Sequence, residues 1–261
     1  MREGTLTPHK IEVMGRASGE EQQNRSHPVI ALSGAHAYGF PSPDSDLDLK
    51  AIHVERAERL LGLSVPRAVR NRLEIIEGVE VDYTSNELQV ALRGLLRGDG
   101  NMLERVLSVA PLRDSPWRAE LAELARRNLS RRYHHHYRGF AHSQRRAVDQ
   151  SAAPRAKKVL YVLRTALTGA HLLRTGECVP DLTELFGPYG LGVVPALIEI
   201  KQQGEQRELP TALAQQVGPA LDRAFALLDA ARDRSPLPEE PAEVEALERW
   251  LVGVRRGDLA E

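Results

Sequence analysis

Residues 32–54 read LSGAHAYGFPSPDSDLDLKAIHV, and this stretch decides the fold. The apolar run at residues 28–32 just before it predicts a short buried strand. Gly34 permits a tight turn into about one turn of helix, and the prolines at positions 41 and 43 then force a loop. A second strand, Leu47–Val54, is expected directly after that loop.

Asp46 and Asp48 open this second strand. Side chains alternate between the two faces of a strand, so both carboxylates point the same way, with Cα atoms about 6.5 Å apart. Backbone N–H groups at a strand–glycine–helix turn can hold phosphate oxygens. Carboxylates that share an ion with substrate phosphates hold Mg²⁺. The stretch therefore predicts a site for a divalent cation, Mg²⁺ or Mn²⁺, together with a phosphate group.

Composition narrows the classes of protein. The 261 residues are long enough to bury an ample core, and the formal net charge of −1 indicates no particular partner. The single cysteine, Cys178, excludes an internal disulfide framework and is typical of a reducing compartment. We find no signal-peptide core and no apolar run of the roughly 20 residues that a membrane span needs. We therefore expect a cytoplasmic protein that does not bind a membrane.

The rest of the chain predicts one mixed sheet followed by helices. Residues 73–77 and 79–84 flank Gly78 and predict a hairpin, whose second strand carries Glu80 and Asp82 on one face. Residues 1–26 predict a loose arm and a short helix. Ser115 and Asp181 are expected to cap later helices. The expected fold is α+β, with a mixed β-sheet and flanking helices in residues 1–112 and an α-helical domain in residues 113–261.

Three stretches resemble a known family. The glycine turn followed after ten residues by Asp46-x-Asp48 resembles the signature of the polymerase-beta-like nucleotidyltransferase superfamily. More narrowly, residues 33–48 resemble the run S-G-S-x-A-[WY]-G-F-x-[ST]-P-D-S-D-x-D of the RNA-repair-pathway DNA-polymerase-beta family, a bacterial and phage family of predicted nucleotidyltransferases. Residues 96–108 and 157–164 are similar to two further helical motifs of that family.

The resemblance implies a nucleotidyltransferase fold and a reaction. A nucleoside monophosphate would pass from an NTP to an acceptor hydroxyl, with release of pyrophosphate and with two metal ions bound. Asp46 and Asp48 would hold both ions. The superfamily places a third carboxylate on a neighbouring strand, where it completes one ion site and accepts a proton. Asp82 is the expected third carboxylate, and Glu80 is the alternative because it shares the same face.

The turn itself departs from the family pattern. Ala35 stands where the family has a serine whose hydroxyl donates to a phosphate oxygen, and the lost bond is worth about 0.5–1.5 kcal/mol. Backbone N–H groups from Ser33 and Gly34 onward remain, and the hydroxyl of Ser33 or Ser45 could substitute. His36 either contacts a phosphate or caps the short helix. The departure favours the alternative of a nucleotide- or RNA-binding module without turnover.

A basic segment lies in the middle of the chain. Residues 126–164 contain eleven lysines and arginines against a single acidic residue, Asp149. Tyr133, Tyr137 and Phe140 interleave with them, a pattern that suits base stacking beside phosphate contacts. We expect this segment to meet a nucleic-acid acceptor, RNA in preference to DNA. The alternative is a solvated helical face, and a protein or small-molecule acceptor stays open.

Within that segment, Lys157, Tyr161 and Arg164 are spaced to share one helical face, with Lys158 beside them. We expect this face to point at the Asp46–Asp48 pair and to neutralise the triphosphate as charge develops on pyrophosphate. The adjacent histidines at positions 134–136 point about 100° apart along a helix and are not expected to share a metal ion.

Overall fold

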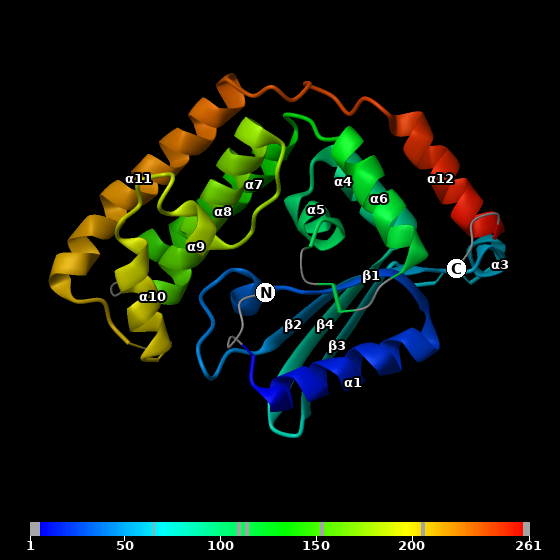
Figure 1. Ribbon diagram of the computed structural model, residues 1–261, viewed down its shortest axis with the longest axis horizontal. Coiled ribbons are helices and arrows are strands. Elements are labelled where there is room, and N and C mark those ends of the chain that lie inside the picture. The colour runs from blue at the N-terminus through cyan, green and yellow to red at the C-terminus, as the bar shows by residue number, and fades with distance from the viewer. Residues whose placement is uncertain are drawn as a thin grey trace. The chain divides into compact units, whose positions relative to one another are not determined.

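The structure is a computed structural model, and it describes residues 6–64, 66–108, 111–112, 115–151, 154–204 and 207–257. The chain forms two compact units (Figure 1). The first unit comprises Met1–His36, Asp46–Asn128 and Pro241–Glu261, and the second comprises Ala37–Ser45 and Leu129–Glu240. Each unit is therefore discontinuous in sequence. The sequence predicts one boundary, between residues 112 and 113. Residue 113 lies outside the described ranges, and the chain passes from one unit to the other at different positions.

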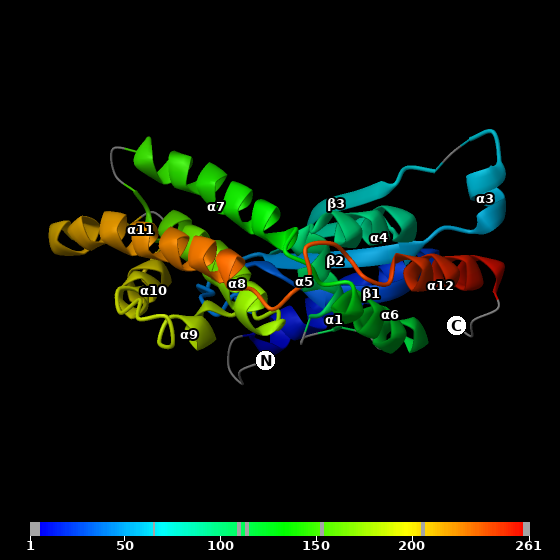
Figure 2. The ribbon, with the colours of Figure 1, turned by 90° about the horizontal axis from the view of Figure 1, so that it is seen from above.

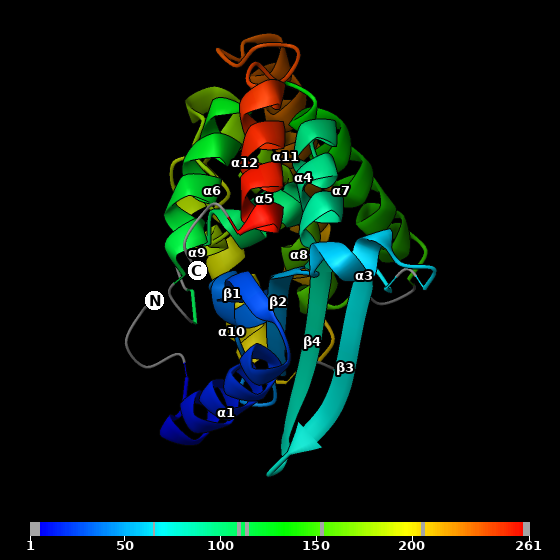
Figure 3. The same ribbon diagram turned by 90° about the vertical axis from the view of Figure 1, so that its right-hand side faces the viewer.

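The first unit is built on a four-stranded sheet of order β1-β2-β4-β3. Its strands are β1 (Ser26–Leu32), β2 (Leu47–Val54), β3 (Val69–Ile76) and β4 (Val79–Glu87). β1 pairs antiparallel with β2, β2 pairs parallel with β4, and β3 and β4 form the antiparallel hairpin expected from the sequence (Figure 3). The sheet is thus mixed, as the sequence predicts.

Helices cover both faces of this sheet (Figure 1). The helices of the first unit are α1 (Pro8–Asn24), α2 (Gly34–Ala37), α3 (Ala57–Leu61), α4 (Leu88–Arg97), α5 (Gly100–Val106), α6 (Pro116–Arg127) and α12 (Val244–Arg256). Val13, Met14 and Ala17 of α1 pack into a core with the inward-facing residues of all four strands. α4 and α5 contact the other face. Residues 8–24 form the helix expected before the first strand, but at 17 residues it is longer than the short helix predicted, and it supplies part of this core.

The last helix returns to the first unit, which explains why the chain does not divide at one point. Arg255 of α12 pairs with Glu87 at 2.9 Å, and the Trp250 indole N–H donates to Glu120 at 2.8 Å. These contacts join positions more than a hundred residues apart, so no local composition change marks them.

The second unit is helical. Its helices are α7 (Tyr133–Asp149), α8 (Ala156–Thr175), α9 (Leu182–Leu185), α10 (Val194–Gln202) and α11 (Thr211–Asp233). α8 is buried along most of its length, and α7 and α11 pack along it (Figure 2). Ser115 and Asp181 cap α6 and α9 as expected. Among the described residues, no helix combines the length and apolarity needed to cross a bilayer.

Candidate active site

The glycine turn and the second carboxylate of the motif pack directly together in the first unit. Gly34 has a backbone φ of 61°, in the left-handed region that favours glycine. A Cβ atom at this position would lie 1.8 Å from Asp48 Oδ2, so glycine is required while Asp48 keeps its position. The Ser33 N–H also donates to the Asp48 carbonyl oxygen at 2.8 Å, which ties the turn to the start of β2.

Asp48 and Asp82 face each other across two parallel strands. They are Cα partners in the β2–β4 register, and neighbouring strands lie about 4.8 Å apart. Their chain neighbours on either side fill the core under α1, so both carboxylates point to the opposite face. Lys50 shares that face, and its Nζ lies 2.8 Å from Asp82 Oδ2 and 3.3 Å from Asp48 Oδ1. One ammonium group thus bridges the two carboxylates.

The environment of Asp48 links it to Asp46 and Asp82. Burial raises the pKa of the Asp48 carboxyl above its usual range, because it takes the charged form out of water. The Lys50 ammonium opposes this rise in pKa, whereas the negative charges of Asp46 and Asp82 add to it. The three carboxylates therefore act as one electrostatic cluster.

The three carboxylates offer oxygen ligands to a divalent cation. Within the described ranges, no group of three or more His, Cys, Asp or Glu side chains is arranged to hold an ion. Asp48 and Asp82 nevertheless present carboxylate oxygens, which Mg²⁺ prefers, and they already gather one cation between them. The donor chemistry fits magnesium once the flexible Lys50 side chain swings aside.

The two alternatives for the third carboxylate occupy different places on β4. Asp82 lies opposite Asp48, and its side chain is 39% exposed. Glu80 precedes the ladder between β2 and β4 and is paired only with Ile75 of β3. Both point to the same face, but the strand register favours Asp82.

Lys50 was not among the residues singled out from the sequence, although the signal was present. Positions 48 and 50 share one face of β2 by simple alternation. Alternation therefore predicts that a basic residue two positions after Asp48 lies next to it on the same face.

A second lysine anchors the loop at residues 37–45 within the second unit. Lys201 of α10 is fully buried, and its Nζ donates to Ser42 Oγ at 2.8 Å and to Ser45 Oγ at 3.3 Å. Ser45 Oγ also accepts the Ser42 N–H at 2.9 Å. The hydroxyl that could have substituted for the missing serine at position 35 is thus engaged inside this loop. No spacing in the sequence connects position 201 with position 42.

The helical face expected to bind the triphosphate packs on the same loop. Tyr161 makes edge-to-face contacts with Tyr38 and Phe40 at centroid distances of 5.8 and 5.5 Å. The Arg164 guanidinium lies 3.7 Å from the centre of the Tyr38 ring, and Arg164 is only 2% exposed. In this arrangement, Arg164 holds the loop in place.

The two lysines of this helix are more accessible. Lys157 is half-buried and Lys158 is exposed. A hydrogen bond with Ser42 holds the pKa of the Asp44 carboxyl below its usual range, and the charges of Lys201 and Lys157 lower it further. Lys157 therefore lies near Asp44 of the loop, and its contact with a nucleotide stays a prediction.

The side chains of the turn itself are poorly exposed. Ala35 and His36 are 4% and 8% exposed, and Ser33 is half-buried. Phosphate recognition at this turn would therefore depend mainly on backbone N–H groups.

Four arginines of the basic segment are paired with acidic residues within the second unit. Its arginines pair with acidic residues from the second half of the chain: Arg131 with Glu239, Arg132 with Glu240, Arg138 with Asp229, and Arg145 with Asp222. The expected stacking role is wrong for Tyr133 and Tyr137, which are 1% and 0% exposed, because their rings fill the helical core. Phe140 is 38% exposed. Counting charges in one window missed these partners because they lie about 80–110 residues further along the chain.

Comparison with known proteins bears on this arrangement. A family model described as the RNA repair pathway DNA polymerase beta family matches residues 17–253. The chain belongs to this family. Membership in the RNA repair pathway DNA polymerase beta family confirms the resemblance seen in residues 33–48 and supports the general class of polymerase-beta-like nucleotidyltransferase.

Two similar proteins share less than 30% sequence identity with this chain. The uncharacterized protein MJ0002 of Methanocaldococcus jannaschii is 26% identical over 218 residues, which cover 82% of this chain and 88% of the relative. The uncharacterized protein YcgL of Bacillus subtilis is 28% identical over 185 residues, which cover 68% of this chain and 70% of the relative. A solved nucleotidyltransferase-like protein from Exiguobacterium sibiricum aligns with a TM-score of 0.33 and 14% identity, covering 95% of this chain and 81% of that one. The assignment to the RNA repair pathway DNA polymerase beta family therefore comes from the family match.

Proposed function

We propose that this chain is a metal-dependent nucleotidyltransferase. It would transfer a nucleoside monophosphate from an NTP to the hydroxyl of a nucleic-acid end, RNA in preference to DNA, and release pyrophosphate. The observation that carries the proposal is the placement of Asp48 directly against the Gly34 turn and directly opposite Asp82. Backbone N–H groups that would bind phosphate therefore lie beside the carboxylates that would bind the metal ion.

Each carboxylate has its own part in this proposal. Asp46, Asp48 and Asp82 would hold Mg²⁺ or Mn²⁺, which when bound neutralises the triphosphate and makes the acceptor hydroxyl more acidic. Asp82 would take the proton from that hydroxyl as its oxygen bonds to the α-phosphorus. The bond from the α-phosphorus to the bridging oxygen breaks, and pyrophosphate leaves with that oxygen. Lys50 would keep Asp48 and Asp82 together while no divalent ion is bound.

The remaining predicted contacts belong to the nucleotide. N–H groups at residues 33–36 would bind triphosphate oxygens. Lys157 and Lys158 would supply positive charge for the leaving pyrophosphate, since their ammonium groups are accessible. Ser45, Tyr161 and Arg164 would act by fixing the loop that leads into Asp46.

Three variants test the assignment. The protein is incubated with each labelled NTP, Mg²⁺ or Mn²⁺ and an RNA oligomer, and both label transfer and pyrophosphate release are measured. Asp48→Asn and Asp82→Asn should each abolish transfer, while Glu80→Gln should retain it. Thermal unfolding of all three variants separates loss of chemistry from loss of folding. Transfer that survives Asp82→Asn but not Glu80→Gln would exchange the roles of these two residues.

One observation favours a second function. Ala35 removes the hydroxyl that the family uses at this turn, so a nucleotide- or RNA-binding module without turnover is the alternative. In the same assay, such a module would bind nucleotide or RNA but yield neither transferred label nor pyrophosphate. Pyrophosphate release that requires a protein or small molecule in place of RNA would keep the enzyme class and change the acceptor.

A further inference from the structure

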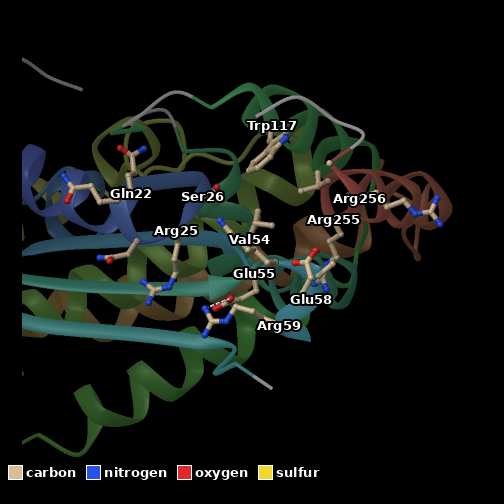
Figure 4. Close-up of a pocket in the computed structure, with 16 residues that line it drawn as sticks. Gln22, Arg25, Ser26, Val54, Glu55, Glu58, Arg59, Trp117, Arg255 and Arg256 are labelled. Carbon is tan, nitrogen blue, oxygen red and sulfur yellow. Dashed lines mark ion pairs between the residues drawn. The ribbon is translucent and has the colours of Figure 1, made fainter. Parts of the chain in front are cut away.

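A cavity of about 770 Å³ lies in the first unit at the end of β2 (Figure 4). Its volume is in the range of ordinary ligand sites. Four parts of the chain build its wall: residues 22–26 at the end of α1, residues 54–59 leading into α3, Trp117 of α6, and residues 254–257 at the end of α12. We call it the arginine pocket, because its lining includes Arg25, Arg56, Arg59, Arg255 and Arg256.

The arginine pocket carries an excess of positive charge. Its five arginines outnumber its two acidic lining residues, Glu55 and Glu58, although Arg25 and Arg255 are paired with Glu21 and Glu87 outside the lining. Glu55 is already bound by Arg59 at 3.3 Å and by Arg70 at 3.4 Å. Arg56 and Arg256 are exposed and, among the described residues, have no carboxylate partner. Two guanidinium groups are therefore available to an anion.

Buried donors in the same wall point to the same ligand chemistry. Trp117 is 4% exposed, and its Nε1 has no hydrogen-bond acceptor within the described part of the chain. The same holds for Nε of Arg255, whose Nη2 is bound to Glu87. Both groups only donate hydrogen bonds. Such donors, together with the charge excess, favour a ligand that offers many acceptor oxygens, and arginine binds phosphate through bidentate, charge-assisted hydrogen bonds.

The pocket is too far from the carboxylate cluster for one nucleotide to occupy both. Val54 at the pocket lies six residues beyond Asp48 along β2, or about 20 Å at 3.3 Å per residue. A polymer can bridge this separation. At about 3.4 Å per nucleotide along one strand of a duplex, 20 Å corresponds to roughly six nucleotides.

We propose that the arginine pocket binds the phosphodiester backbone of the acceptor nucleic acid, about six nucleotides away from its reacting end. The inference rests on the proposed function for the identity of the acceptor, but the pocket itself is a separate site. It would position long acceptors and leave short ones unaffected.

Binding of labelled RNA to the full-length chain tests this assignment without requiring turnover. Fluorescence anisotropy compares an RNA of about 20 nucleotides with one of about 4 nucleotides, at several salt concentrations. The test variant is Arg56→Ala with Arg256→Ala. The matched control is Arg93→Ala with Arg249→Ala, which removes two exposed arginines from α4 and α12, both of the first unit, outside the pocket.

The test variant should bind the long RNA at least about tenfold more weakly, and the slope of log affinity against log salt should fall by about two. The short RNA should bind both variants and the wild type equally. Equal weakening by test and control variants, or no weakening by either, would overturn the proposal. Loss of binding to free ATP or inorganic phosphate in the test variant, with long RNA unaffected, would overturn it too and assign the pocket to a small anion.

The proposed function fails independently of this site. Failure of the transferase proposal would appear as pocket-dependent RNA binding without any label transfer. Failure of the pocket proposal would appear as label transfer whose Michaelis constant for the long RNA is the same in wild type and the test variant.

Discussion

Replacing Gly34 with alanine tests whether its contact with Asp48 serves the chemistry. The added Cβ would lie 1.8 Å from Asp48 Oδ2, and real contacts do not fall below 3.0 Å. The carboxylate must therefore move by about 1.2 Å, the difference between these two distances. A misplacement of about 1 Å can lower an enzymatic rate about 100-fold. The backbone φ of 61° adds about 1–2 kcal/mol of strain for alanine.

Gly34→Ala should accordingly fold with reduced stability and transfer the nucleotide about 100-fold more slowly than wild type. Two matched substitutions separate these effects. Gly78 has a φ of 82° and open space around it, so Gly78→Ala brings backbone strain without the clash. Gly15, in α1, has neither, and Gly15→Ala should stabilise by about 0.5–1 kcal/mol. Urea unfolding and initial transfer rates are measured for all three. A Gly34→Ala protein that is as stable as Gly78→Ala and transfers at the wild-type rate refutes the reasoning.

Four further outcomes are expected. Burial lowers the pKa of His27 and of His53 from 6.5 to about 4. Between pH 6.5 and about 4, only the unfolded chain binds these protons, so the free energy of unfolding falls as the pH drops, by roughly 3 kcal/mol per histidine. The urea midpoint should fall over the same pH range, and it should fall less in His27→Gln. Lys201→Met should reduce the free energy of unfolding by about 1–3 kcal/mol and slow transfer, whereas unchanged values of both would contradict its anchoring role. Lys50→Met should enlarge the rise in melting temperature caused by Mg²⁺, since the ammonium competes for the same carboxylates; an equal rise speaks against that competition. Arg164→Ala should raise the Michaelis constant for nucleotide, and a loss of stability alone would leave it a purely structural residue.

Local patterns predicted the elements around the candidate site well. β2 spans Leu47–Val54, as the alternation of apolar and polar residues indicates, and the hairpin pairs Leu73 with Asp82 around the turn at Gly78. Strand alternation also put Glu80 and Asp82 on one face of the hairpin, because that periodicity needs no knowledge of the rest of the fold; the choice of Asp82 came from the family resemblance, and its pairing with Asp48 agrees with that choice.

Contacts between distant parts of the chain account for what the sequence did not predict. The acidic partners of Arg138 and Arg145, Asp229 and Asp222, come from a different helix. Lys201 reaches Ser42 across more than 150 positions. The N-terminal helix was expected to be short because only a narrow apolar stripe, Val13, Met14 and Ala17, enters the core.

The assignment of the loop at residues 37–45 to the second unit has a practical consequence. The polypeptide passes between the two units four times, twice within the span of its most recognisable motif. Expressing residues 129–240 alone would strip Lys201 of Ser42 and Arg164 of Tyr38, leaving a lysine and an arginine in an apolar interior. We therefore expect that neither continuous half of the chain folds independently. A truncated or recombined protein must therefore keep the loop at residues 37–45 together with the helices of the second unit.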